Sequence, residues 1–384
     1  MSSAQTLFDR YRHELAHLDA DLPPVFQKAV QNLPSTLAAS QQQRWGEDGV
    51  VLARTSTRLA AAYFDATAHL LARVDPDVLG DCKELALQLT DRSPLVAVAF
   101  LQASPDFLSH RDAAALQEWV HQGGRFCRGS WKSAALAQLF FASSATLMQS
   151  LSANEFQKLA AVILRLSEHS MDLASSCLGR AAEVFASLAA SERLDFIDLA
   201  DQVVATTWSD AWHYFESGPE LLSSVVKDQR GHFLQLVTQI SAADASPPLP
   251  ILSATAGAIA EMASVEHAEL IQLASRLASH NAAAAVEFLK SVLFVRQRIT
   301  REALHGWLAR GLQLSVEGHD RDAVAAFFRI ETAGAQLLLG SLSGRVEFER
   351  FAGRLRLYAT ALGGEEMQLQ SSDMLAERNI GWVT

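Results

Sequence analysis

The motif H-E-L-A-H at residues 13–17 has the most specific chemistry in this chain. It fits the pattern H-E-x-x-H, in which two histidines one helical turn apart bind zinc and the glutamate activates water. Leu7 and Tyr11 belong to an apolar stripe on one side of this helix. His13 and His17 lie roughly opposite the stripe and are expected to face water.

A catalytic zinc ion also needs a shielded cleft and a third protein ligand, and no downstream Glu or His stands in a recognisable context for that role. Arg10 and Arg12 would repel a dication. The sequence therefore predicts no metal site. A zinc metallohydrolase that uses His13, Glu14 and His17 stays as an alternative, and an exposed polar helix face is the simpler interpretation.

Cys127 is the second residue with possible chemistry, because Arg125 and Arg128 beside it could favour the thiolate. A small core residue near a helix end is the simpler interpretation, since free cysteine is commonly buried. The phosphate-binding loop G-x-x-x-x-G-K-S/T, the motif G-x-G-x-x-G and the nucleophile motif G-x-S-x-G are all missing from the sequence. We therefore predict no catalytic residue and no cofactor-binding residue, and expect a protein that is not an enzyme.

Composition excludes several other classes. Of the 384 residues 49% are hydrophobic and 20% are charged, which suits a large buried core and not a disordered chain. The net charge of −11 argues against nucleic-acid binding and against attraction to anionic lipids. Three distant cysteines and the lack of a secretory signal predict a reducing, cytoplasmic environment. The uncharged stretch 133–154 contains too many polar residues for a membrane span, and we expect a buried helix pair there.

Helical periodicity runs along nearly the whole chain. Ser152 and Glu155 have the spacing of a capping box, and an apolar face follows them. Asp112 is expected to cap a helix that ends at Gly123-Gly124. Another helix is expected from Thr300. The one candidate strand is short and covers residues 367–370. The predicted fold class is all-α.

Phenylalanine-centred segments recur at Phe100, Phe141, Phe185, Phe215 and Phe327. Most of them precede a short polar break and a second amphipathic segment, in units of about 40 residues. Such units are typical of HEAT-like helical repeats, in which each unit buries its apolar face against its neighbours. The alternative is an irregular large helical bundle. Four tryptophans at core spacings are expected to pack between the layers, although one of them could instead bind a partner: Trp119, Trp208, Trp212 and Trp307.

Breaks in the pattern suggest three zones. Residues 1–45 form an N-terminal helical lead-in with prolines at positions 23, 24 and 34. Residues 46–340 form the helical repeat domain, with a break near the prolines of residues 247–250. Residues 341–384 form a helix and a linker that would lead toward a C-terminal domain absent from this chain.

The C-terminal zone contains L-R-L-Y-A-T-A-L-G-G-E at residues 355–365 and N-I-G-W at residues 379–382. Both stretches resemble the linker of the NorD/CbbO-type proteins, which have a helical N-terminal region and a C-terminal von Willebrand factor A domain. The turns at Ser104-Pro105 and Gly218-Pro219 are also similar to that helical region. The metal motif D-x-S-x-S of the von Willebrand domain is missing, and residues 172–176 have the wrong spacing. No metal residue of the family can therefore be assigned here.

The resemblance implies a chaperone-like adaptor that binds the hexamer of a MoxR-type AAA+ ATPase and couples it to a client enzyme. For CbbO-type members the client is inhibited Rubisco, and Rubisco activation is the role we favour. For NorD-type members it is nitric oxide reductase during assembly, which is the alternative. A stand-alone repeat adaptor unrelated to any ATPase is a further possibility.

Overall fold

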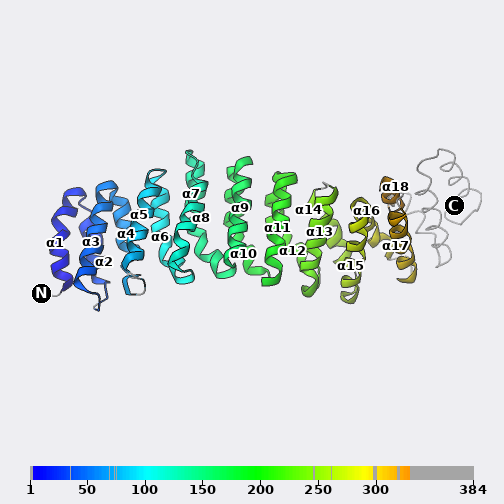
Figure 1. The fold of residues 1–384 in the computed structure, drawn as a ribbon, viewed down its shortest axis with the longest axis horizontal. Helices are drawn as coiled ribbons and strands as arrows, with labels where there is room; N and C mark the ends of the chain where they lie inside the picture. Colours follow the sequence, from blue (N-terminus) through cyan, green and yellow to red (C-terminus); the bar gives the residue numbers. More distant parts are fainter. Residues whose placement is uncertain are drawn as a thin grey trace, which may run out of the picture. The chain divides into compact units, whose positions relative to one another are not determined.

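The computed structural model of the chain describes residues 3–34, 36–68, 70–72, 74, 76–244, 247–260, 262–296, 301–317 and 321–328. Every regular element in these ranges is a helix, so the all-α prediction is confirmed (Figure 1). The contacts divide the chain into unit 1, Met1–Ser187, and unit 2, Leu188–Thr384. Within each unit the helices pack against their neighbours in sequence order, as in a helical repeat array.

The helices described in unit 1 are α1 (Ser3–Leu18), α2 (Leu22–Gln31), α3 (Ala39–Thr55), α4 (Thr57–Thr67), α5 (Pro76–Thr90), α6 (Pro94–His110), α7 (Leu116–Phe126), α8 (Trp131–Ser150), α9 (Ala153–His169) and α10 (Met171–Ser187), with short 3-10 turns at Leu70–Ala72 and Ala113–Ala115. Each odd-numbered helix pairs with the even-numbered helix that follows it. Odd helices also contact the next odd helix, and even helices the next even helix. Unit 1 is therefore a stack of helical hairpins in two layers.

The helices described in unit 2 are α11 (Ala190–Thr207), α12 (Ala211–Ser223), α13 (Arg230–Asp244), α14 (Pro248–Ala260), α15 (Ser264–His280), α16 (Ala282–Arg296), α17 (Arg301–Val316) and α18 (Arg321–Phe328), with 3-10 turns η3 (Trp208–Asp210) and η4 (Lys227–Gln229). The same contacts recur: α11 packs on α12 and α13, and α12 packs on α14. None of the helices that the structure describes is long and apolar enough to cross a bilayer.

Several polar contacts between neighbouring hairpins join residues that are 40 positions apart in the sequence. In unit 1, Arg54 donates to Glu14 at 2.6 Å and Lys132 donates to Asp172 at 2.7 Å. In unit 2, the Gln235 amide donates to Asp195 at 3.1 Å. These pairs are largely exposed and contribute at most about 1 kcal/mol each. They mark the repeat, whereas burial of apolar side chains stabilises it.

The phenylalanine anchors all lie in even-numbered helices and are all buried: Phe100, Phe141, Phe185, Phe215 and Phe327. Their spacing in the sequence is irregular because they occupy different turns. Phe100 lies in the second turn of α6 and Phe185 in the last turn of α10, whereas α6, α8, α10 and α12 begin at the more regular positions 94, 131, 171 and 211. The repeat is therefore defined by the position at which each helix starts, and the buried phenylalanine occupies a different turn in different helices.

Local signals account for several helix ends. The capping box before α9 is confirmed: Ser152 N–H donates to Glu155 Oε2 at 2.6 Å, and Glu155 N–H donates to Ser152 Oγ at 3.3 Å. Prolines begin α6 and α14 at positions 94 and 248, where the missing N–H costs no helical hydrogen bond. Proline also lies inside α6, at Pro105. The Leu101 carbonyl that would have accepted the missing N–H accepts the Ser104 hydroxyl instead, at 2.8 Å.

The structure corrects some local predictions. Gly123 and Gly124 do not end their helix but lie inside α7, which continues to Phe126. Gly123 is needed for packing, because a Cβ there would lie 2.1 Å from Cζ of Phe141. Asp112 makes no side-chain cap and precedes a 3-10 turn. The uncharged stretch 133–154 is not a complete helix pair: residues 133–150 belong to the single helix α8, and only residues 153–154 begin α9.

Several predictions concern residues or boundaries that the structure does not test. The predicted start at Thr300, the candidate strand at 367–370 and the zone 341–384 lie outside the described residues. The predicted boundary at residue 45 stays a prediction. In the structure α1 and α2 contact α3 and α4 in the way that later hairpins contact each other.

Candidate protein-binding surface

The three residues of the H-E-x-x-H motif lie on α1. His13 and His17 are exposed, as the periodicity predicted, and Glu14 is half-buried. The Glu14 carboxylate accepts a hydrogen bond from Arg54 of α3, so it takes part in the contacts between hairpins. In the part of the chain that the structure describes, no three His, Cys, Asp or Glu side chains are grouped as metal ligands would be.

The three cysteines lie in different environments. Cys82 on α5 and Cys177 on α10 are buried, and burial raises the pKa of each thiol to about 12. Cys127 follows the end of α7 and is only partly buried. The structure brings no described histidine or carboxylate into a hydrogen bond with any of the three thiols.

We expect Cys127 to be the one thiol that a disulfide reagent such as Ellman's reagent modifies quickly in the folded protein. A thiol with a pKa near 12 is ionised in only about one molecule in 10⁵ at pH 7, and Cys82 and Cys177 are also shielded from the reagent. Absorbance should report about one reactive thiol per native chain and about three in guanidinium chloride. Cys127→Ser should abolish the fast reaction, and a fast reaction that survives this change would contradict the assignment.

An open depression lies on unit 1 across three even-numbered helices. Its floor is largely apolar, and its edge carries charged and amide side chains. The residues that line it are Val25 and Lys28 of α2, Arg58, Ala61, Ala62 and Asp65 of α4, and Val98 and Gln102 of α6. Lys28 lies 3.8 Å from Asp65, and both side chains are about three-quarters exposed. The depression is too open for a site that must exclude water, and it suits contact with another macromolecule.

Two large apolar side chains lie exposed on neighbouring even-numbered helices. Leu95 in the first turn of α6 is 50% exposed, and Trp131 at the first position of α8 is 78% exposed. Ser130 caps α8 by accepting from Ser133 N–H at 3.1 Å, which fixes the turn that presents Trp131. A tryptophan this exposed loses hydrophobic stabilisation that a bound partner would restore.

The burial of the tryptophans differs in part from the prediction. Trp119 and Trp307 are buried as expected, and Trp212 is half-buried. The prediction that Trp208 packs in the core is wrong: it is 40% exposed, because it begins η3 at the turn between α11 and α12. Trp131 received no role from the sequence.

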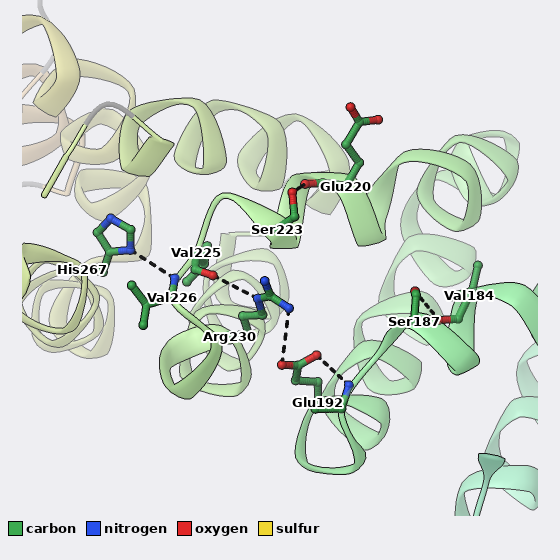
Figure 2. Close-up of polar contacts among 10 residues, drawn as sticks. Val184, Ser187, Glu192, Glu220, Ser223, Val225, Val226, Arg230 and His267 are labelled. Atoms are coloured by element: carbon green, nitrogen blue, oxygen red, sulfur yellow. Dashed lines mark hydrogen bonds and ion pairs between the residues drawn. The ribbon is translucent and has the colours of Figure 1, made fainter. Parts of the chain in front are cut away.

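Unit 2 contains a buried polar network at the turns between its helices (Figure 2). Glu192 of α11 is 1% exposed and accepts from Ala189 N–H at 3.0 Å. Arg230 of α13 lies 3.8 Å from the other oxygen of Glu192 and donates to the Val225 carbonyl at 3.0 Å. Glu192 Oε2 and Arg230 Nε bind backbone atoms of the turns, so this network links neighbouring hairpins of unit 2.

His267 of α15 extends this network to the next hairpin. Its Nδ1 accepts from Val226 N–H at 3.2 Å (Figure 2). Its Nε2 lies 3.3 Å from the Met262 carbonyl. These two contacts require the neutral tautomer with the proton on Nε2. His267 is 4% exposed, so it acts as a buried link between backbone groups.

The surface of unit 1 formed by α2, α4, α6 and the start of α8 is therefore the best candidate for function. We call it the even-helix surface and define it by the depression together with Leu95, Trp131 and Lys132. Comparison of the chain with protein-family models, with curated proteins and with solved structures gives no match in any of the three.

Proposed function

We propose that this protein is a non-enzymatic helical-repeat scaffold that binds protein partners. The observation that carries the proposal is the even-helix surface, where an open apolar depression adjoins the exposed Leu95 and Trp131. Stacked helical hairpins present a long surface on which a large partner can dock without a deep pocket. An exposed tryptophan is the residue type most often found at the energetic centre of protein interfaces.

The partner that we propose is the hexamer of a MoxR-type AAA+ ATPase, with inhibited Rubisco as the client enzyme. This identification rests on the likeness of residues 355–365 and 379–382 to NorD/CbbO-type proteins. The proposal places the protein in the cytoplasm, which agrees with three free cysteines. The scaffold would contribute the docking surface, and the ATPase would supply the energy from nucleotide hydrolysis.

Mixing the full chain with a MoxR-type hexamer and a non-hydrolysable ATP analogue tests this pairing. We expect the two to elute together in size-exclusion chromatography with light scattering, at concentrations of about 10 µM. Trp131→Ala should reduce the co-eluting fraction, and Trp208→Ala serves as the matched control, since Trp208 is also exposed but lies in unit 2. If the chain and the hexamer elute separately both with and without the ATP analogue, the ATPase is refuted as the partner.

The client is tested separately. Rubisco blocked by a tight-binding sugar phosphate should regain activity when chain, ATPase and ATP are all present, and should stay inactive when the chain is left out. If co-elution holds but Rubisco stays inactive, Rubisco is refuted as the client and the NorD-like assembly role is the next to test.

A further inference from the structure

We propose that the even-helix surface docks an acidic amphipathic helix of a partner protein, lying across α2, α4, α6 and the start of α8. The inference rests on the proposed scaffold function and specifies the chemistry of what the scaffold binds. It does not depend on the ATPase being that partner.

The apolar floor is a row of equivalent positions. Val25 is the fourth residue of α2, and Ala61 and Val98 are the fifth residues of α4 and α6. Neighbouring packed helices lie about 8–10 Å apart, so the row offers one apolar position about every 10 Å. Seven residues of an α-helix span about 10.5 Å. A helix that crosses the row should therefore bury apolar residues spaced about seven apart.

Leu95 and Trp131 extend this row on one side. Leu95 precedes Val98 by one helical turn and lies on the same side of α6. The neighbouring helix α8 runs in the same direction as α6, because Arg111, just after α6, donates to the carbonyl of Leu151, just after α8. Leu95 and Trp131 thus lie at the same ends of adjacent helices. Together they provide larger apolar anchors than the floor itself, and large aromatic anchors contribute much of the binding energy of protein interfaces.

The charged residues of the even-helix surface determine which side chains the docked helix should carry on its polar face. Lys28 lies beside Asp65, and Lys132 donates to Asp172 at 2.7 Å, so these two cations already have carboxylate neighbours. Arg58 is exposed at the edge of the depression and has no ion pair among the described residues. A carboxylate on the occupant can accept two parallel hydrogen bonds from its guanidinium group.

The same features disfavour a nucleic acid. Trp131 beside Lys132, whose ammonium lies 5.7 Å from the ring centre, could stack on a base. A strand of phosphates, however, needs a continued series of cations. Between Lys132 and the end of α8 the helix carries no charged residue at all. An amphipathic helix in a groove fits both the apolar row and the single unpaired cation.

Selection from a display library of random 20-residue peptides on the immobilised full chain tests the proposal. We expect enriched peptides to carry carboxylates and to repeat apolar residues at spacings of about seven. A fluorescein-labelled copy of the most enriched peptide should bind with a Kd in the range of about 1–100 µM by fluorescence anisotropy. Its affinity should fall at high salt, because one charge pair contributes to it.

Three variants locate the site. Arg58→Glu should weaken peptide binding about tenfold or more, and Trp131→Ala about fivefold or more. Arg12→Glu makes the same charge change at an exposed position of α1 and should change binding less than about twofold. All three side chains are exposed, so each variant should keep the far-UV circular dichroism spectrum of the unchanged chain.

Failure to enrich any peptide, enrichment of basic peptides, or equal binding to all three variants would overturn the proposal. Enrichment of single-stranded RNA over peptides in a parallel selection would also overturn it. These results are distinguishable from failure of the ATPase pairing. If the peptides bind as expected but the hexamer does not co-elute, the docking surface is supported and only the ATPase is refuted.

Discussion

Replacing Phe141 with alanine is expected to lower the free energy of unfolding of unit 1 by about 3–5 kcal/mol. Phe141 is fully buried on α8, with its ring centre 5.0 Å from that of Trp119 and 5.6 Å from those of Phe100 and Phe140. Its removal leaves a cavity where three hairpin helices meet. Collapse is limited, because the rings around it also pack on other neighbours.

Urea denaturation followed by circular dichroism, with hydrogen exchange of α6 to α8 as the local readout, measures the effect. Phe141→Leu is the matched control and should cost less than half as much, because it keeps most of the volume. Gly123→Ala should also destabilise α7, since its new Cβ would lie against the Phe141 ring. In the Phe141→Ala background that cost should largely vanish, because the obstructing ring is gone. A loss below about 1 kcal/mol for Phe141→Ala would contradict the packing of α6, α7 and α8.

The second large effect is expected at Arg230, whose replacement by methionine should lower the free energy of unfolding of unit 2 by about 2–4 kcal/mol. Glu192 is 1% exposed, and its Oε1 has no hydrogen-bond partner, so the Arg230 guanidinium at 3.8 Å is the charge that compensates it (Figure 2). Removing one partner of a buried ion pair leaves the other charge without compensation, which costs more than the pair itself contributes. We expect less than the full penalty because Arg230 is about one-fifth exposed.

The matched control is Glu192→Gln, which removes the charge and keeps an acceptor for Ala189 N–H. In that background Arg230→Met should cost only about 1 kcal/mol, the value of its hydrogen bond to Val225. Denaturation combined with hydrogen exchange of α11 and α13 separates the two contributions. Equal costs in both backgrounds would mean that Arg230 does not compensate Glu192.

Features that depend on neighbouring turns of one helix could be predicted from the sequence. The capping box at Ser152 and Glu155, the outward face of His13 and His17, and burial of the phenylalanine anchors follow from interactions within one or two turns. Such interactions depend on residues three or four positions apart, so one chain suffices to predict them. The order of helices in the array follows as well, because short connections place consecutive helices side by side.

Other features depend on residues far apart in the sequence. The Gly123-Gly124 pair has the chemistry of a helix end, but it lies inside α7. The Phe141 ring, eighteen positions later, explains why position 123 has no room for a side chain. Trp208 matches core periodicity but lies at a turn that breaks the period. The even-helix surface requires Val25, Ala61 and Val98 to meet from three helices.

The sequence by itself therefore determined that this protein is a series of amphipathic helices with an apolar core and which residues of each helix face that core. The tertiary structure alone decided which outward-facing residues become neighbours, because that depends on the stagger of successive hairpins. Stagger is set by side-chain packing between helices, so it cannot be read from a single helix and is seen only once the hairpins are stacked.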